Sequence, residues 1–178
     1  MFINLQQLEQ RPVRFKVDLP AGEIDFDSKI TQFSSLHSEG SAHLLNHALG
    51  EIRIEGKLNV TVEATCDRCL EAAILPIENQ FDLVYMPAGE ASGVENEIDQ
   101  EAIEVGFYEG NGLELNDVLR EVVLLALPMR VVCSEACKGF CPVCGRNRNQ
   151  TDCGCHVDSI DDRWSKLRSF RSEAGHRN

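Results

Sequence analysis

Eight cysteines constrain this 178-residue chain more than any other feature, because six of them fall in the short stretch from Cys133 to Cys155. The other two, Cys66 and Cys69, lie far upstream. The N-terminus, Met-Phe-Ile-Asn-Leu-Gln-Gln, has neither the positive charge nor the apolar run of an export signal. We therefore expect a cytoplasmic, reducing location, where clustered cysteines bind metal more often than they form disulfides.

The spacing of the cysteines is typical of zinc ligands. Two thiolates on one tight turn occupy two corners of a tetrahedron, and a second pair brought in by folding completes it. Gly145 follows one pair and Gly154 separates another, which lets the backbone turn around a metal. We expect two structural zinc ions, since a catalytic zinc would keep an open position. The predicted ligands are Cys66, Cys69, Cys133, Cys137, Cys141, Cys144, Cys153 and Cys155.

Two groupings of these thiolates are open. A site made of the last four cysteines, Cys141 to Cys155, closes the shortest loop and so costs the least chain entropy. The pair Cys133–Cys137 would then join the remote pair Cys66–Cys69 and tie the C-terminal segment to the rest of the chain. The competing arrangement groups Cys133–Cys137 with Cys153–Cys155, and His156 could replace a ligand in either one.

Alternating apolar and polar residues predict a β-rich N-terminal part. The expected strands cover residues 13–19, 52–64, 74–85 and 103–107. Gly56 interrupts the second of these and could mark a hairpin turn or a bulge, whereas the Ser/Gly-rich residues 28–42 are typical of a loop. Pro76 favours an edge position for its strand. Cys66–Cys69 should therefore lie at a turn between two strands.

The period changes to that of a helix at residues 117–127. Asn116 is the expected N-cap, and Pro128 ends the helix because the residue before a proline avoids the α region. A second short helix is predicted from Ser159, with Trp164 on its apolar face. The expected fold class is α+β: a β-rich domain with one buried helix and a C-terminal cysteine-rich zinc-binding tail.

The distribution of charge divides the chain in two. Residues 1–128 hold 8 Lys+Arg and 23 Asp+Glu, a net charge of -15, whereas residues 129–178 hold 9 and 6, a net charge of +3. We therefore expect an acidic domain over 1–128 and a basic tail over 129–178 that packs on it. A polyanion such as RNA would be repelled by the chain as a whole and could bind only a local basic patch. The longest apolar stretch, Val122 to Met129, is too short to cross a membrane.

Several motifs together resemble a known family. They are Cys66-Asp67-Arg68-Cys69-Leu70-Glu71, the run from Cys133 to Asn149, Cys153-Gly154-Cys155, and Asp162-Arg163-Trp164-Ser165-Lys166-Leu167. In these the chain resembles the YceD family, the large ribosomal RNA subunit accumulation proteins of bacteria and plastids. The resemblance extends from about Gly50 to Leu167. It implies a role in the accumulation of large-subunit ribosomal RNA, hence in ribosome assembly, and it supplies no catalytic residues.

We therefore expect a non-enzymatic assembly factor, a zinc-stabilised module that binds pre-ribosomal large-subunit RNA or a ribosomal protein and neither a membrane nor a small-molecule substrate. The basic tail could contact RNA phosphates, and the acidic residues 90–121 could hold a basic protein. The alternative is a thiol–disulfide redox protein that uses Cys66 and Cys69. Reactive dithiols usually begin a helix, whose N-terminus lowers the thiol pKa, so a position between strands disfavours this alternative.

Overall fold

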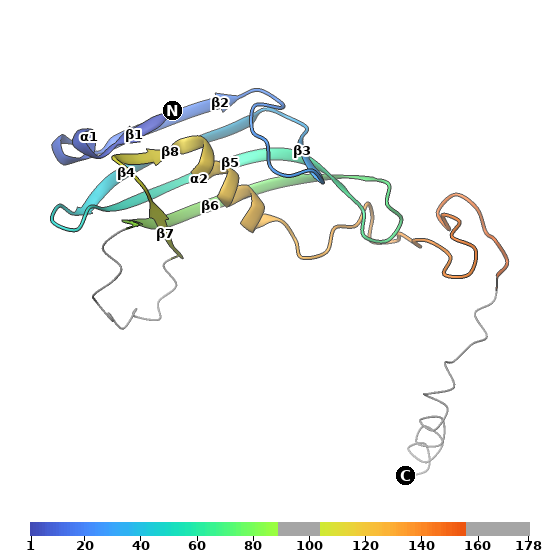
Figure 1. The fold of residues 1–178 in the computed structure, drawn as a ribbon. Helices are drawn as coiled ribbons and strands as arrows, with labels where there is room; N and C mark the ends of the chain where they lie inside the picture. The colour runs from blue at the N-terminus through green and yellow to red at the C-terminus, as the bar shows by residue number, and fades with distance from the viewer. Residues whose placement is uncertain (89–103, 156–178) are drawn as a thin grey trace, which may run out of the picture.

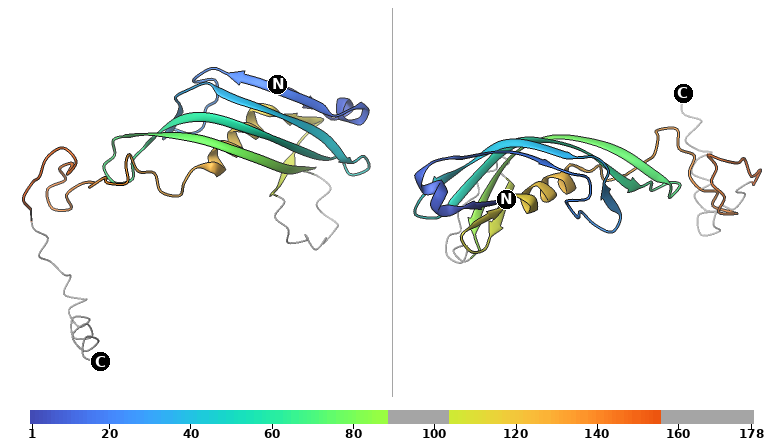
Figure 2. Two further views of the ribbon diagram at one scale, coloured as in Figure 1. Left: turned by 180° about the vertical axis from the view of Figure 1, so that it is seen from behind. Right: turned by 90° about the horizontal axis from the view of Figure 1, so that it is seen from above.

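A curved sheet with one helix across its concave face makes up most of the molecule (Figures 1 and 2). The computed structural model describes residues 1–88 and 104–155. The main sheet has six strands, in the order β2-β4-β5-β6-β7 with β3 paired to β5. They are β2 (Val13–Leu19), β3 (Ile30–Gln32), β4 (Leu36–Asn46), β5 (Glu51–Thr65), β6 (Ala72–Pro87) and β7 (Glu104–Tyr108). The pairs are antiparallel except for β6 with β7, which is parallel. A mostly β fold with two helices agrees with the predicted α+β class.

The long central strand β5 shows how alternation builds the core. Every second side chain along it is buried, and the side chains between them are not. Helix α2 (Leu115–Ala126) lays Val118, Leu119, Val122 and Val123 against this buried face. Burial of a valine or leucine side chain contributes roughly 1.5–3 kcal/mol. The contact between α2 and the sheet is therefore the main hydrophobic core.

Helix α2 begins earlier than the sequence indicates. Its N-cap is Glu114 and not Asn116, because the preceding strand β8 (Gly112–Glu114) pairs with β1 (Phe2–Asn4) up to that residue. The Glu114 carboxylate accepts a hydrogen bond from the N-terminal amine of Met1 at 2.8 Å. At the other end Leu127 is extended, as expected for the residue before Pro128. The short helix α1 (Leu5–Gln10), which follows β1, was not predicted.

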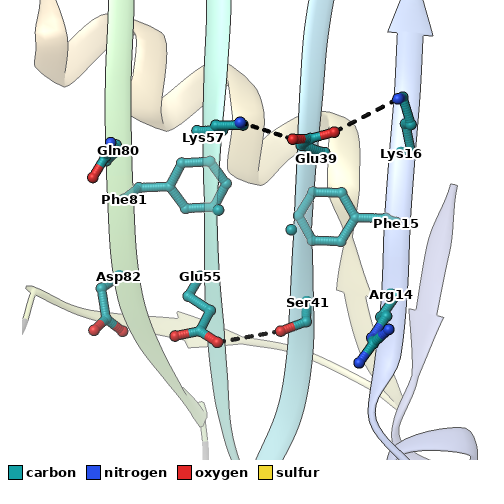
Figure 3. A pocket seen from close by; sticks show the side chains of 12 residues that line it. Arg14, Phe15, Lys16, Glu39, Ser41, Glu55, Lys57, Gln80, Phe81 and Asp82 are labelled. Atoms are coloured by element: carbon teal, nitrogen blue, oxygen red, sulfur yellow. Dashed lines mark hydrogen bonds and ion pairs between the residues drawn. The ribbon is translucent and has the colours of Figure 1, made fainter.

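Two glycines let aromatic rings lie across the sheet (Figure 3). Gly40 of β4 and Gly56 of β5 are paired with each other. Phe15 and Phe81 pair with them from the neighbouring strands, so the four residues form one row. A Cβ on Gly56 would lie 2.9 Å from the Phe81 ring, and one on Gly40 would lie 2.7 Å from the Phe15 ring. The predicted turn or bulge at Gly56 is wrong, because ring packing, and not a chain reversal, requires the glycine.

Residues 28–42 are not the expected loop. They contain β3 and the first half of β4, which lies between β2 and β5 and is paired on both sides. Buried Ser38 shows why a polar sequence is tolerated there: its hydroxyl donates to the Lys57 carbonyl at 3.0 Å. Pairing with neighbours overrides a weak local preference, as is common for strands.

Three other predictions concern the strands. The Cys66–Cys69 turn lies between β5 and β6, as expected, and β7 confirms the short strand predicted at 103–107 within one residue. Pro76 lies on a part of β6 that has a partner on one side only among the described residues.

The tail helix predicted from Ser159 lies outside the residues that the structure describes. No helix within 1–88 or 104–155 is both long and apolar enough to span a membrane.

Candidate metal centres

The first cysteine pair lies on a tight turn at the tip of the β5–β6 hairpin. Cys66 follows the last residue of β5, and its N–H donates to the Glu71 carbonyl at 2.9 Å. The Leu70 N–H returns to the Cys66 carbonyl at 2.9 Å, and Leu70 has a left-handed φ of 57°. The turn buries Cys66 and Cys69 almost completely, so both sulfur atoms face inward and away from water.

A segment more than sixty residues later in the chain docks on this turn. The Asp67 N–H donates to the Val131 carbonyl at 2.8 Å, and the Val131 N–H donates to the Asp67 carboxylate at 2.7 Å. The Arg68 guanidinium donates to the Cys137 carbonyl at 2.9 Å. The sequence analysis did not predict these contacts. The one indication of them in the sequence is that Asp67 and Arg68, which are polar, lie between Cys66 and Cys69. They bring the second cysteine pair against the first.

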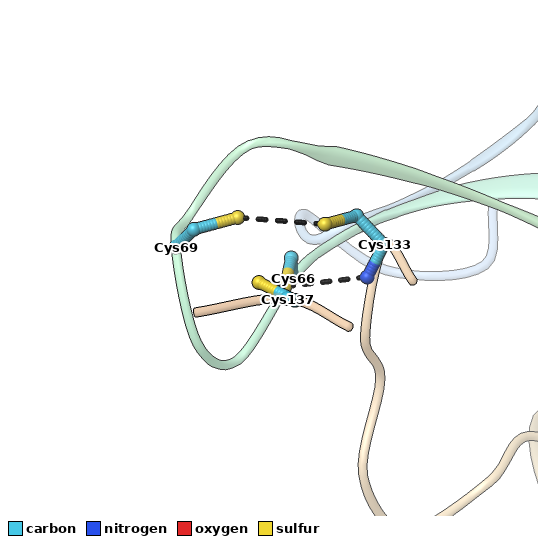
Figure 4. Close-up of side chains that lie close together, drawn as sticks. All are labelled: Cys66, Cys69, Cys133 and Cys137. Atoms are coloured by element: carbon cyan, nitrogen blue, oxygen red, sulfur yellow. Dashed lines mark hydrogen bonds between the residues drawn. The ribbon is translucent and has the colours of Figure 1, made fainter. Parts of the chain in front are cut away.

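The four sulfur atoms of this first cluster converge (Figure 4). The Cys66 and Cys137 sulfur atoms are 3.9 Å apart, and those of Cys69 and Cys133 are 3.6 Å apart. All four lie within 4.8 Å of one another. The Cys133 N–H donates to the Cys66 sulfur at 3.3 Å, and the Asn149 side-chain amide donates to the Cys137 sulfur at the same distance.

The second cluster is local and lies nearer the surface. Its four sulfur atoms also lie within 4.8 Å of one another, and only Cys141 among them is buried. The Cys141 N–H donates to the Arg146 carbonyl at 2.8 Å, and the Gly145 N–H donates to the Cys141 carbonyl at 2.9 Å. Gly145 has a φ of +70°, as a turn of this kind requires. The members are Cys141, Cys144, Cys153 and Cys155.

The structure therefore brings together the two groups that the loop-closure argument favours. The alternative, with Cys133–Cys137 beside Cys153–Cys155, does not occur. No histidine among the described residues lies in either cluster, and that includes His43 and His47. His156 lies outside the described residues. Each of the two clusters could hold a metal ion.

Hydrogen bonds aimed at sulfur favour the ionisation of Cys66 and Cys137 in the first cluster and of Cys141 in the second. Burial opposes the ionisation of Cys66, but the N–H groups around it, led by that of Cys133, outweigh this effect and lower the pKa of the thiol to about 6. The N–H groups of Cys144 and then Val143 lower the pKa of Cys141 to about 6. The Asn149 side-chain amide likewise lowers the pKa of Cys137, so each cluster holds at least one sulfur prepared to act as a thiolate ligand.

The remaining thiols show why a cation fits these sites. Neighbouring thiols, first that of Cys144, raise the pKa of Cys155 to about 12. The Glu71 N–H favours the Cys69 thiolate, but burial and the surrounding thiols outweigh it and raise that pKa to about 12. Several thiolates this close repel one another unless a cation lies between them. Four sulfur donors without carboxylate or water suit a tetrahedral, thiophilic ion.

A polar trough lies on the outer face of the sheet (Figure 3). Several of its polar side chains pair with one another. Lys57 and Lys16 pair with Glu39 at 2.8 and 3.7 Å, and Ser41 donates to Glu55 at 3.3 Å. Lys57 lowers the pKa of the Glu39 carboxyl. We assign no site to this trough, because both of its lysines already pair with Glu39.

Comparison with known proteins agrees with the cysteine pattern. The family described as large ribosomal RNA subunit accumulation protein YceD matches residues 54–171, which contain all eight cysteines. The chain belongs to the YceD family. A chloroplastic YCED homolog 1 of Arabidopsis thaliana is 22% identical over 69% of this chain and 45% of its own length. Uncharacterized proteins of Mycobacterium bovis and Mycobacterium tuberculosis are 28% identical over 65% of this chain and 54% of their own length.

The chain thus spans about half the length of the curated relatives that it matches. No solved structure matches it. The chemistry that the described part of this YceD protein offers is that of its two four-cysteine clusters.

Proposed function

We propose that this protein is a non-enzymatic factor that supports the accumulation of large-subunit ribosomal RNA in the cytoplasm. It acts as a zinc-stabilised module that binds pre-ribosomal large-subunit RNA or a ribosomal protein. The observation that carries the proposal is the YceD match over residues 54–171, together with the name of the Arabidopsis relative. That name supports a role in the accumulation of large-subunit ribosomal RNA, and the binding role is our extension of it.

The structural role of zinc rests on the make-up of the clusters. Each offers four cysteine sulfur atoms, a full tetrahedral set that leaves no position for substrate or water. The first ion would hold residues 133–137 to the tip of the β5–β6 hairpin. The second would close the loop from Cys141 to Cys155. In this proposal the acidic domain 1–128 and the basic tail 129–178 act as one unit, joined by the first ion.

The redox alternative has weaker support. Cys66 and Cys69 lie between two strands and not at the start of a helix, so no helix dipole activates them. Both are buried, and the thiols of Cys133 and Cys137 surround them. A metal bound by all four would leave few reactive thiols, so thiol titration of the protein as isolated separates the two functions.

The test of the assembly role is a depletion experiment with rescue. Loss of the protein should lower the ratio of large to small ribosomal subunits, and a wild-type copy should restore it. The wild-type protein should also sediment with precursors of the large subunit. Unchanged subunit ratios after depletion would contradict the proposed function. The double variant Arg146→Glu, Arg148→Glu distinguishes the two classes of partner, because it reverses two basic side chains of the tail and keeps every cysteine. Failure of this variant to rescue would indicate RNA, and full rescue would indicate a ribosomal protein.

A further inference from the structure

We propose that the free edge of β6 binds an extended, lysine- and arginine-rich segment of a ribosomal protein as an added strand. This inference rests on the proposed function and names the class of partner that would serve it. RNA is the competing partner, and the test below gives it a distinct outcome.

The edge itself is long. β7 pairs only with Leu83–Pro87 of β6, so among the described residues Ala72–Asp82 have a strand partner on one side alone, namely β5. Figures 1 and 2 show β6 running along the border of the sheet beyond β7. A free edge presents a row of unpaired backbone groups, which is a template for another chain.

The register shows which backbone groups point outward. The Thr61 carbonyl accepts hydrogen bonds from the N–H groups of Phe33 and Ser34 at 2.9 and 3.1 Å, so Thr61 of β5 faces away from β6. Its partner in β6 is Pro76, which must therefore direct its own backbone toward the free edge. Pro76 has no N–H to offer there. By alternation, the next outward-facing groups come from Glu78, Gln80 and Asp82.

A groove runs beside this part of the edge on the concave side. It has a volume of about 280 Å³ and is lined by residues 79–83 of β6 and by Val122 and Leu125 of α2. Leu125 is 61% exposed, whereas every other leucine and valine of α2 is buried or half-buried. A strand added to β6 would direct alternate side chains into this groove and cover Leu125.

Charge favours a basic protein segment over RNA. The formal charge of -12 counts each cysteine as neutral. Eight thiolates and two divalent ions would change it by -4, to -16, and the positive charge of the tail would fall with it. Glu78 lies on the edge, and Glu121 lies one turn before Leu125, where it accepts a hydrogen bond from Tyr85. A polyanion is repelled by such a surface, and a cationic extended segment is attracted.

The test uses the full-length zinc-loaded protein with a photo-reactive amino acid placed at Gln80. RNA-free ribosomal proteins of the large subunit and, separately, large-subunit ribosomal RNA are the two probes. The expected result is a crosslink to a lysine- and arginine-rich segment of one ribosomal protein. A crosslink from this position to RNA alone would overturn the inference.

Matched variants at the same position test the added strand. Gln80→Pro removes an outward N–H that has no strand partner within 1–88 or 104–155, and Gln80→Ala keeps it. Gln80→Pro should weaken binding of the ribosomal protein identified by crosslinking by about tenfold, because an edge hydrogen bond is lost. Gln80→Ala should bind like the wild type. Equal binding by both variants would overturn the inference.

A second pair of variants decides the matter if Gln80→Pro does not fold by circular dichroism. Leu125→Lys places a cation in the groove and should weaken binding more than Leu125→Glu, which keeps the groove acidic. The reverse order would overturn the inference. If only the inference is wrong, the wild-type protein still sediments with large-subunit precursors. If the proposed function is wrong, it does not.

Discussion

Asp67 and Val131, 64 residues apart in the chain, exchange two hydrogen bonds beside the first cysteine cluster, at 2.8 and 2.7 Å. One of them uses the Asp67 carboxylate and the other uses only backbone. The pair therefore positions Cys133 against the β5–β6 turn through contacts that do not involve metal. Such support around a metal ligand is expected to raise affinity by preorganising the site.

Asp67→Ala should lower the zinc affinity of the first site by about tenfold, because outer contacts of this kind typically contribute 10–100-fold. The Val131 N–H loses its acceptor while all four cysteines remain. Competition with a chromophoric chelator measures the effect. Glu135→Ala is the control, since within the described structure the Glu135 side chain has no hydrogen bond or ion pair. Equal affinities for the two variants would show that Asp67 does not support the site.

Zinc content tests the two clusters directly. We expect two zinc ions per chain by elemental analysis of protein purified under reducing conditions without chelator, because two separate four-cysteine groups are present. Cys141→Ser and Cys69→Ser should each leave one strongly bound ion. A wild-type value near zero would contradict the metal assignment, and a value near one would limit it to a single cluster.

The same two cysteine variants should differ in limited proteolysis. Cys141→Ser loosens only the local loop, because the second cluster joins residues close in sequence. Cys69→Ser should be the more sensitive of the two, since the first cluster joins the tip of the β5–β6 hairpin to residues 133–137. Cleavage around residues 127–132 reports the release of this segment. Equal protection of both variants would argue against the joining role of the first cluster.

Gly139→Ala should destabilise the region around the first cluster more than Gly145→Ala does. Both glycines have a left-handed φ, +67° and +70°, so each alanine adds backbone strain of roughly 1–2 kcal/mol. A Cβ on Gly139 would also lie 2.8 Å from the Arg68 carbonyl oxygen, whereas one on Gly145 meets nothing within 4 Å. Urea unfolding of the zinc-loaded variants measures the difference. Equal losses would show that the loop yields to remove the contact.

Zinc binding should be coupled to protons. Cys66 and Cys141, whose pKa values are lowered to about 6, are thiolates at pH 7.5 and become protonated as the pH falls through 6. Zinc affinity should therefore decrease as the pH falls, most steeply below about 6. Cys69 and Cys155, whose pKa values are raised to about 12, keep their protons until metal displaces them. Adding zinc to the metal-free protein in weak buffer at pH 7.5 should thus release protons, and a constant pH would contradict this.

The sequence alone determined the features that depend on local pattern. Strict alternation predicts β2, and an apolar period of 3.6 followed by Pro128 predicts the body and the end of α2. Cysteine spacing indicates which side chains could ligate metal, and loop length favours one grouping of them. These inferences hold because each depends on residues close together in the chain.

Only the tertiary structure decided the features that depend on distant neighbours. Gly56 looks like a break in the sequence, yet β5 continues through it because the Phe81 ring packs there. Residues 36–42 become a central strand because β2 and β5 provide hydrogen-bond partners on both sides. The first cysteine cluster forms because Asp67 and Arg68 hold a segment that is remote in sequence. Contacts between residues far apart in the chain leave no periodic trace in it, so the fold alone reveals them.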